Sequence, residues 1–236
     1  MTSSTLPEGV GRAFVTTLRD TLTGAADALG DLDRRAGDGD FGDNVSIAMK
    51  NLSASLEEGE PADYRGWVTA MSRAWLGVGG TSGPLLGMFF RDLAKAADAR
   101  AAEAENANSG AGEGGAPTLA QFAEALAAGQ AVIQKYGEAE VGDKTMIDAL
   151  DPAVTALRDA VDAGEDPQAA MAAAEQAAVD AARGTAETVA RRGRASYVGD
   201  AAKGVIDPGA AAMALVLGAA RTAVDGGGEV DTGWIS

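Results

Sequence analysis

The stretch VGRAFVTTLRDTLTGAADAL, residues 10–29, decides the fold class of this 236-residue chain. Its large apolar residues recur at every fourth position, at Val10, Phe14, Leu18 and Leu22. This spacing places them in one stripe along an α-helix, with a polar face opposite. Similar helical patterns continue along the chain, while β-branched runs of strand length are nearly absent. We therefore expect helices over residues 10–29, 44–56, 64–76, 84–101, 119–136, 143–163, 167–191 and 208–224.

The composition indicates how these helices pack. Alanine supplies 53 residues and glycine 32, so that helices can approach each other closely. We predict an all-α fold, an eight-helix antiparallel up-and-down barrel or bundle, formed by a single domain over residues 1–225. Residues 103–117 are rich in Gly, Asn and Glu without periodicity, and we expect them to form a flexible loop insertion. The C-terminal tail, residues 226–236, should fray unless Trp234 and Ile235 dock.

The residue types that the chain lacks exclude several kinds of chemistry. It has no cysteine and no histidine, which excludes disulfides, thiolate zinc sites, cysteine nucleophiles, Ser-His-Asp triads and phosphohistidine relays within it. The 19 Lys and Arg residues against 35 Asp and Glu give a formal charge of −16, which repels a nucleic-acid backbone. Neither a basic amino-terminal leader nor an apolar run of membrane-spanning length occurs. We expect a soluble cytoplasmic protein that binds neither nucleic acid nor a membrane.

Four interruptions of the helical pattern share a composition, with Gly beside Asp, Ser or Thr just before a helix. They cover residues 33–44, 77–84, 141–145 and 191–209. Taken singly, each is explained about equally well by helix capping and turn formation. A pocket for a nucleotide and its metal ions would explain all four together, because helix amino termini bind anions and carboxylates bind the accompanying cations. We favour this shared explanation, since it needs one cause rather than four.

Three aspartates in the first interruption are candidate metal ligands. Asp33, Asp38 and Asp40 cannot share one face of a helix, so we expect them to converge from a loop. Carboxylates without His or Cys favour Mg²⁺ or Ca²⁺, and Mg²⁺ is the usual partner of phosphates. An EF-hand loop is excluded because Asp43 and Met49 stand where it needs Gly and Glu. An aspartyl-phosphatase site is excluded because no buried apolar strand precedes the loop.

The second interruption offers hydroxyl groups at a helix start. It comes close to the pattern G-x-G-x-x-G, but it follows a helix rather than a strand, so a dinucleotide-binding fold is not indicated. A P-loop is absent from the sequence as well. Thr81 and Ser82 stand just before Pro84, which can open a helix at its first position. We expect this helix start to bind an anion.

The third and fourth interruptions each carry a candidate helix cap. Asp143 can cap the helix that follows it, and Asp207 can cap the last helix with Pro208 in its first position. Gly209 is small enough for a ligand to come close. Arg194 lies in a basic cluster of an otherwise acidic chain, either as an anion ligand or as a complement to a helix carboxyl end.

Together, four motifs resemble a known family. GDGDFGDN, GGTSGPLLGMFF, GDKTMIDAL and GRASYVGDAAKGVIDPGA occur in the order and approximate spacing of the nucleotide-binding L subunit of dihydroxyacetone kinase, DhaL. The similarity spans roughly residues 18–224. This resemblance implies an eight-helix antiparallel barrel that holds ADP or ATP at one end, with two Mg²⁺ ions between aspartates and phosphates.

The resemblance also implies the site residues. The metal ligands that assist transfer fall on Asp33, Asp38 and Asp40, and no protein nucleophile is required. Nucleotide contacts fall on Phe41, Gly42, Asn44, Thr81, Ser82, Gly137, Met146, Arg194, Asp207, Pro208 and Gly209. Phe41 stands where many bacterial L subunits have His, so a polar contact near the nucleotide is missing.

The function implied is phosphoryl transfer to a small keto-sugar that a separate K subunit holds through a histidine. This chain would then be a phosphotransferase subunit that is active only with a K subunit. Some family members exchange ATP, whereas others keep the nucleotide bound and have it rephosphorylated by a phosphohistidine partner, the M subunit of a phosphotransferase system. Two other functions stay open: a non-enzymatic nucleotide- or metal-sensing module that regulates a partner, and a helical interaction protein whose acidic loop binds cations nonspecifically.

Overall fold

The computed structural model describes residues 4–98, 115–193, 196 and 199–235, and this part contains eight long α-helices. They are α1 (Val10–Ala36), α2 (Phe41–Glu58), α3 (Tyr64–Leu76), α4 (Ser82–Ala94), α6 (Leu119–Gly137), α7 (Met146–Ala163), α8 (Pro167–Gly184) and α9 (Pro208–Val224). Two short 3₁₀ helices, η1 (Thr185–Glu187) and η3 (Gly199–Ala202), lie between α8 and α9. The described residues form no strand and only an isolated bridge between Thr5 and Thr118. The predicted all-α class is therefore confirmed.

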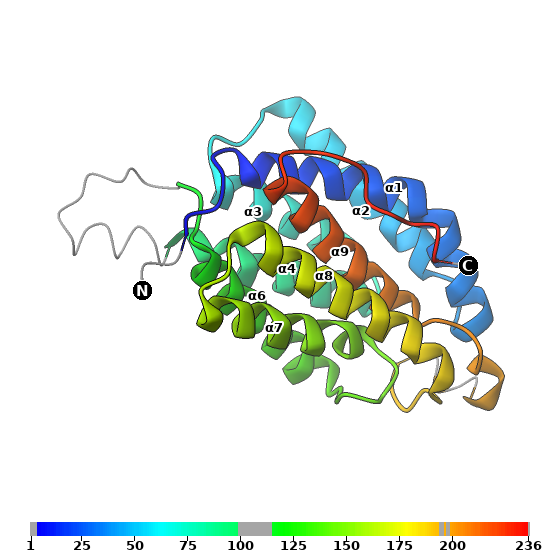
Figure 1. The fold of residues 1–236 in the computed structure, drawn as a ribbon. Helices are drawn as coiled ribbons and strands as arrows, with labels where there is room; N and C mark the ends of the chain where they lie inside the picture. The colour runs from blue at the N-terminus through cyan, green and yellow to red at the C-terminus, as the bar shows by residue number, and fades with distance from the viewer. Residues whose placement is uncertain (1–3, 99–114, 194–195, 197–198, 236) are drawn as a thin grey trace.

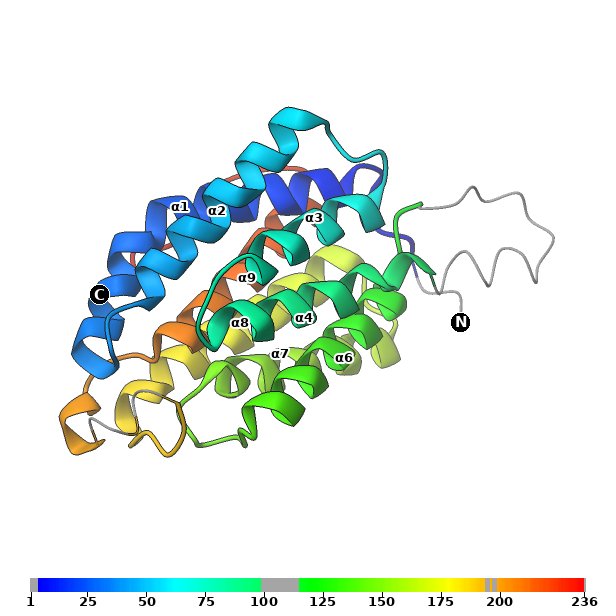
Figure 2. The ribbon, with the colours of Figure 1, turned by 180° about the vertical axis from the view of Figure 1, so that it is seen from behind.

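The helices form a closed antiparallel ring (Figures 1 and 2). Each helix packs against the next one along the chain, and α9 returns to pack against α1. This up-and-down order brings the carboxyl ends of α1, α3, α6 and α8 to the same end of the molecule as the amino ends of α2, α4, α7 and α9. Within the described residues, no helix is long and apolar enough to cross a membrane.

The helix boundaries follow local capping chemistry. The predicted bounds of α3 and α9 agree with the structure, because Asp63 and Asp207 cap their first turns as side-chain acceptors. Thr118 opens α6 with a reciprocal capping box to Gln121. The prediction for α8 was too long, since the helix ends at Gly184 and the chain continues through η1.

The core differs between the two sides of the ring. Aromatic side chains fill the side formed by α1, α3 and α4, where Phe14, Trp75, Phe89 and Phe90 are fully buried. On the other side, α8 buries alanines at every fourth position, namely Ala170, Ala174, Ala178 and Ala182. Small residues at this spacing let α8 lie close to α7 and α9, which agrees with the packing expected from the alanine content.

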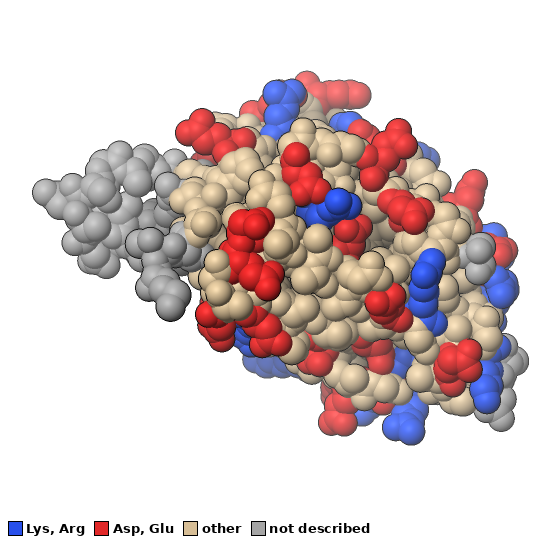
Figure 3. Space-filling model, viewed as in Figure 1, with Lys and Arg blue, Asp and Glu red and all other residues tan. Residues whose placement is uncertain are grey.

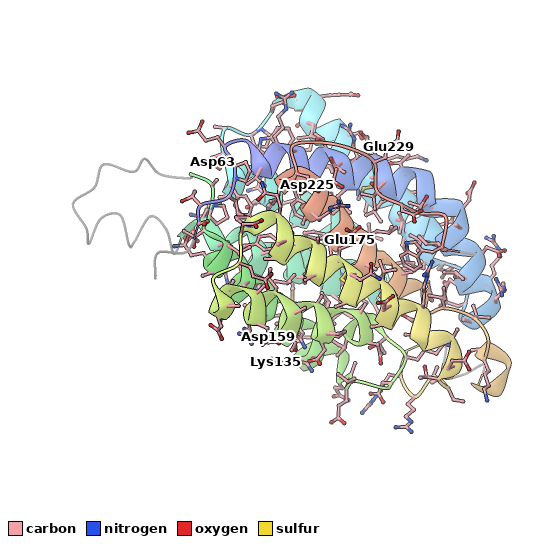
Figure 4. All side chains as sticks on the ribbon, in the orientation of Figure 1. Asp63, Lys135, Asp159, Glu175, Asp225 and Glu229 are labelled. Atoms are coloured by element: carbon pink, nitrogen blue, oxygen red, sulfur yellow. The ribbon has the colours of Figure 1, made fainter. Side chains whose placement is uncertain are left out.

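The C-terminal tail docks onto the helices instead of fraying. Trp234 and Ile235 are buried, and the Arg183 guanidinium lies 5.8 Å from the centre of the Trp234 ring. The tail runs back across α9 and α1 (Figure 1), which explains why α9 is buried on nearly all sides. Beside it, Arg221 pairs with Glu175 at 3.5 Å and with Asp225 at 2.6 Å. Figure 4 shows Glu175 on α8 and Asp225 just after the end of α9.

Two further expectations concern the loop insertion and the surface charge. Of the expected loop over residues 103–117, residues 103–114 lie outside the described part of the chain. On the face viewed in Figure 3, Asp and Glu side chains are spread over the surface, with Lys and Arg between them rather than gathered into a basic patch. This distribution gives a nucleic-acid backbone no continuous positive surface on that face.

Candidate functional site

Four helix amino termini meet around one pocket at the end of the ring. The first residues of the helices, Phe41 of α2, Ser82 of α4, Met146 of α7 and Pro208 of α9, all line it. The pocket has a volume of about 220 Å³. Backbone N–H groups in a first helical turn have no intrahelical acceptor, and the helix dipole adds positive potential there. The up-and-down topology therefore produces a pocket suited to an anion, without any cluster of basic side chains.

Most of the residues predicted as ligands line this pocket. They are Asp33, Asp38, Asp40, Phe41, Asn44, Thr81, Ser82, Gly137, Met146, Asp207, Pro208 and Gly209. Residues from four separate interruptions of the helical pattern thus meet at one place. Arg194 lies outside the described residues, but its neighbours Arg192 and Gly193 contribute to the pocket wall.

Gly42 is placed differently from the other predicted contacts. It does not line the pocket but sits where α2 crosses α1. A Cβ atom there would lie 2.6 Å from the Ala26 carbonyl oxygen and 2.7 Å from the Gly30 Cα atom. The structure therefore explains this glycine by close helix packing, and its contact with a nucleotide stays a prediction.

The aspartates come from a helix end and the turn after it. The expectation that all three lie in a loop was wrong for Asp33, because α1 continues past the predicted end to Ala36. The helix continues because Leu32 and Ala36 extend its buried stripe, while two arginines in the last turn complement the dipole. Asp33 Oδ2 then accepts a hydrogen bond of 2.9 Å from the Phe41 amide, which folds the turn back over the helix end.

The carboxylates in this turn repel each other. Burial raises the pKa of Asp33, the Phe41 amide acts against this, and the negative charge of Asp38 raises the pKa further. A bound cation would remove this repulsion, and the donors are all hard oxygens, as Mg²⁺ prefers. Among the described residues, no three metal-ligating side chains are gathered closely enough to form a complete metal site. The aspartates therefore fit a cation that takes further ligands from elsewhere, such as phosphate oxygens.

Two of the expected helix starts needed correction. Ser82 opens α4, so Pro84 stands third in the helix, where its missing N–H is still not needed for an intrahelical bond. Thr145 rather than Asp143 caps α7, because Thr145 forms a reciprocal capping box with Asp148. Asp143 instead accepts a hydrogen bond of 2.9 Å from the Glu140 amide within the turn.

Polar contacts join the pocket walls. Asn44 Nδ2 donates to Ser82 Oγ at 3.3 Å, which links the starts of α2 and α4. Asp207 caps α9 as predicted, with Oδ2 accepting from the Ala210 amide at 2.7 Å. Burial raises the pKa of Asp207 to about 7, the Ala210 amide lowers it, and the charge of Asp148 raises it.

Sequence reasoning missed Lys144. Its side chain is 1% exposed and forms part of the pocket wall, where its ammonium group contacts three backbone carbonyls. Burial lowers its pKa, while the carboxylate of Asp207 raises it. A lysine within the motif GDKT was a visible signal, but the carbonyls that it contacts lie more than forty positions further along the chain. The sequence alone does not place them together.

Apolar side chains also line the pocket. They are Leu85, Ile133, Met146 and Pro208, together with Phe41. A pocket lined by helix starts, carboxylates and apolar side chains suits a ligand that has both charged groups and a flat apolar group. A nucleotide with its metal ions has this character.

Comparison with known proteins decides the family. The DAK2 domain matches residues 35–222 of the chain, which include all the pocket residues except Asp33. This chain belongs to the DAK2 domain family. Within the family, it is 35% identical over 190 residues to the ADP-binding subunit DhaL of PEP-dependent dihydroxyacetone kinase 1 from Listeria innocua, covering 80% of this chain and 83% of that subunit. The DhaL subunit from Escherichia coli is 32% identical over 206 residues, with coverage of 86% and 91%.

Longer DAK2 proteins match over part of their length only. Human triokinase/FMN cyclase is 35% identical over 199 residues, which are 84% of this chain but 32% of the human protein. The crystal structure of the dihydroxyacetone kinase from C. freundii in complex with AMP-PNP and Mg²⁺ matches with a TM-score of 0.64 and 27% identity, over 92% of this chain and 34% of that one. The helical ring is thus a fold that the family uses both as a subunit and as part of a longer chain.

Proposed function

We propose that this chain is the nucleotide-binding subunit of a dihydroxyacetone-type kinase, which passes the terminal phosphoryl group of ATP to a small keto-sugar held by a separate K subunit. The observation that carries the proposal is the meeting of four helix amino termini and three aspartates at one pocket. The DhaL relatives, named ADP-binding subunits, support the nucleotide, and the C. freundii kinase complex with AMP-PNP and Mg²⁺ supports both the nucleotide and the metal.

The phosphates would lie at the helix starts. Unpaired N–H groups of the first turns of α4 and α9 would donate to phosphate oxygens, together with the hydroxyl groups of Thr81 and Ser82. The apolar part of the pocket, including Ile133 and Met146, would contact the base.

Asp33, Asp38 and Asp40 would hold two Mg²⁺ ions against these phosphates. When bound, the ions neutralise charge on the transferred phosphoryl group. Asp33 is the anchored member of the set, because the Phe41 amide fixes its Oδ2 atom. Asp38 and Asp40 precede α2 in a turn that Gly39 enters with a φ of 85°, a value that favours glycine.

The transfer needs no protein nucleophile. The sugar hydroxyl oxygen forms the new bond to phosphorus as the bond between phosphorus and ADP breaks, and catalysis is mostly positioning and charge neutralisation. The chain has no histidine with which to hold a sugar covalently. In this proposal a K subunit presents the acceptor sugar at the mouth of the pocket.

The exposed apolar surface fits such a partner. The large hydrophobic side chains that are exposed in the described part of the chain have exposed fractions between 39% and 59%. Four of them lie at the pocket end, and Ile47 lies almost two turns into α2 from that end. We call this set the apolar rim, and it consists of Ile47, Leu76, Tyr136, Val141 and Val189. Apolar side chains around a reaction site are typical of a surface that a partner covers.

Reconstitution tests the proposal. Purified chain, a K subunit from a DhaL-dependent kinase, dihydroxyacetone and Mg²⁺–ATP should give sugar phosphate, and omission of either protein should give none. Tyr136→Ser combined with Val141→Ser should lower the rate of transfer while leaving nucleotide affinity unchanged. A nucleotide sensor would bind Mg²⁺–ATP and form no sugar phosphate. Release of near-stoichiometric ADP from freshly purified protein would favour supply through a phosphohistidine partner over exchange with ATP.

A further inference from the structure

A buried lysine fastens one wall of the pocket. Lys144, in the turn between α6 and α7, points its ammonium group at the connection between α8 and α9. Nζ donates to the carbonyl oxygens of Ala202 and Val205, each at 2.8 Å, and of Thr188 at 3.3 Å. An ammonium group has three N–H donors, so these carbonyls use all of them.

The three acceptors stand at the two ends of one segment. Thr188 follows η1, whereas Ala202 ends η3 and Val205 comes shortly before α9. A single ammonium group therefore closes the base of the segment over residues 188–205. A backbone hydrogen bond of 2.8 Å, donated by the Gly204 amide to the Ala186 carbonyl, also joins the two ends of this connection.

Described residues near both ends of this segment line the pocket. Arg192 and Gly193 line the pocket from within the segment, and Asp207 lines it just after the segment. The Asp207 amide donates to Thr185 Oγ1 at 2.8 Å, so the start of α9 is tied to the end of α8 next to the closed base. The position of the ammonium group thus determines where two parts of the pocket wall lie.

The backbone of Lys144 is consistent with a demanding side-chain role. Its φ is 64°, in the left-handed region that costs a residue with a Cβ atom about 1 kcal/mol or more. Gly142, two residues before it, also has a positive φ. A glycine would adopt this φ at lower cost, so the backbone conformation does not account for the lysine, whereas the contacts of its ammonium group do.

We infer that Lys144 is a positioning residue that does not bind phosphate. Through three backbone carbonyls it ties together the two ends of the connection between α8 and α9, at Thr188 on one side and at Ala202 and Val205 on the other. The inference rests on the proposed function, because it concerns the wall of the same nucleotide pocket. It distinguishes Lys144 from the lysine of a P-loop, which contacts phosphates directly. All three of its N–H donors are already used by backbone carbonyls.

Hydrogen exchange in the nucleotide-free protein tests this role. Lys144→Met removes the ammonium group and keeps the length of the side chain, whereas Lys203→Met removes an exposed lysine from the same connection. We expect amides between residues 186 and 207 to exchange at least about tenfold faster in Lys144→Met, as loss of hydrogen bonds from a charged group implies. Lys203→Met should exchange as the wild type does. Nucleotide affinity should fall by about tenfold or more in Lys144→Met only.

A second measurement needs no variant and covers the case in which Lys144→Met does not fold. Acetylation of the five lysines of the wild-type protein, followed by mass spectrometry, reports how accessible each ammonium group is. Lys144 should react at least about tenfold more slowly than Lys203 without nucleotide, and Mg²⁺–ATP should add little protection.

Two results would overturn the inference. One is exchange over residues 186–207 that is as slow in nucleotide-free Lys144→Met as in the wild type. The other is a Lys144 that reacts as fast as Lys203 in the nucleotide-free wild-type protein. Both exchange and acetylation are decided in nucleotide-free protein, so a chain that bound no nucleotide would refute the proposed function while these results still decided the role of Lys144.

Discussion

Replacing Asp207 with Asn should stabilise the nucleotide-free protein at alkaline pH. Asp207 caps α9 through a hydrogen bond of 2.7 Å from the Ala210 amide, yet only 7% of the residue is exposed. Burial is the main reason that its pKa is raised from 3.8 to about 7. The Ala210 amide and the positive charge of Lys144 lower this pKa, but by less than burial raises it. Asn caps helices about as well as Asp does and resembles the neutral acid.

The sign follows from proton binding. Unfolded chains release this proton around pH 3.8, whereas the folded protein keeps it up to about pH 7. Between these values the folded state binds the extra proton, so the free energy of unfolding falls as pH rises and then stays constant above the folded pKa. At about 1.4 kcal/mol per pH unit, the total loss is ~4 kcal/mol. The amide side chain of the Asp207→Asn variant has no proton to lose, so the variant avoids this loss.

Urea denaturation at about pH 5 and about pH 8, without nucleotide or Mg²⁺, measures the effect. The stability advantage of Asp207→Asn over wild type should grow by about 3 kcal/mol between these pH values. Asp166→Asn is the matched control, because Asp166 also caps a helix with proline in its first position but is exposed. Its substitution should change stability by less than about 0.5 kcal/mol at both pH values. An advantage of Asp207→Asn that did not grow with pH would refute the reasoning.

Three further substitutions test packing and the pocket mouth, and the two that test packing each have a control variant. Gly42→Leu should lower the free energy of unfolding by about 2 kcal/mol or more, because a Cβ atom at this position would lie 2.6 Å from the backbone of α1. Gly24→Ala has open space around the new methyl group and should raise the free energy of unfolding by about 0.5–1 kcal/mol. Urea titrations of both variants measure these changes. Trp234→Ala should lower the free energy of unfolding, measured by thermal denaturation, by about 3 kcal/mol, because the docked tail loses a buried side chain. Glu229→Gln, in an exposed part of the same tail, should change stability little. Equal effects of the two substitutions would contradict the docking of the tail. Leu76→Ser at the apolar rim should reduce the rate of sugar-phosphate formation by about tenfold when the K subunit is subsaturating, and it should leave the affinity for ATP unchanged. A parallel loss of ATP affinity would argue against a docking role for the apolar rim.

Much of the fold was predictable because it depends on local signals. The stripe of Val10, Phe14 and Leu18 and the Asp-Pro cap at 207–208 are readable along the chain, and the structure has helices there. Short connections join α1 to α2, α2 to α3, α3 to α4, α6 to α7 and α7 to α8, and these favour antiparallel neighbours. What the sequence could not provide was the exact end of α1, because burial of Leu32 and Ala36 depends on neighbouring helices rather than on nearby residues.

The sequence predicted most of the residues that line the pocket, but it did not predict how several of them are held in place. The motifs around Asp38, Ser82 and Asp207 resemble those of the DhaL family, and their residues line one pocket. The role of Gly42 in helix packing was not apparent, because a glycine in a motif looks the same whether it faces a ligand or a helix. The carbonyl contacts of Lys144 were not apparent either, since backbone acceptors leave no trace in the residue types.

The central claim is that the pocket binds an adenine nucleotide through Mg²⁺ held by the aspartates. Isothermal titration of ATP and ADP into the chain, with Mg²⁺ and then with EDTA, tests it most directly. Asp38→Asn and Asp40→Asn remove predicted ligands, and Asp43→Asn is the control, because Asp43 is exposed and does not line the pocket. We predict Mg²⁺-dependent binding by wild type and Asp43→Asn, and binding at least about tenfold weaker in the other two variants. Equal affinity in all four proteins, or affinity that EDTA leaves unchanged, would contradict the account.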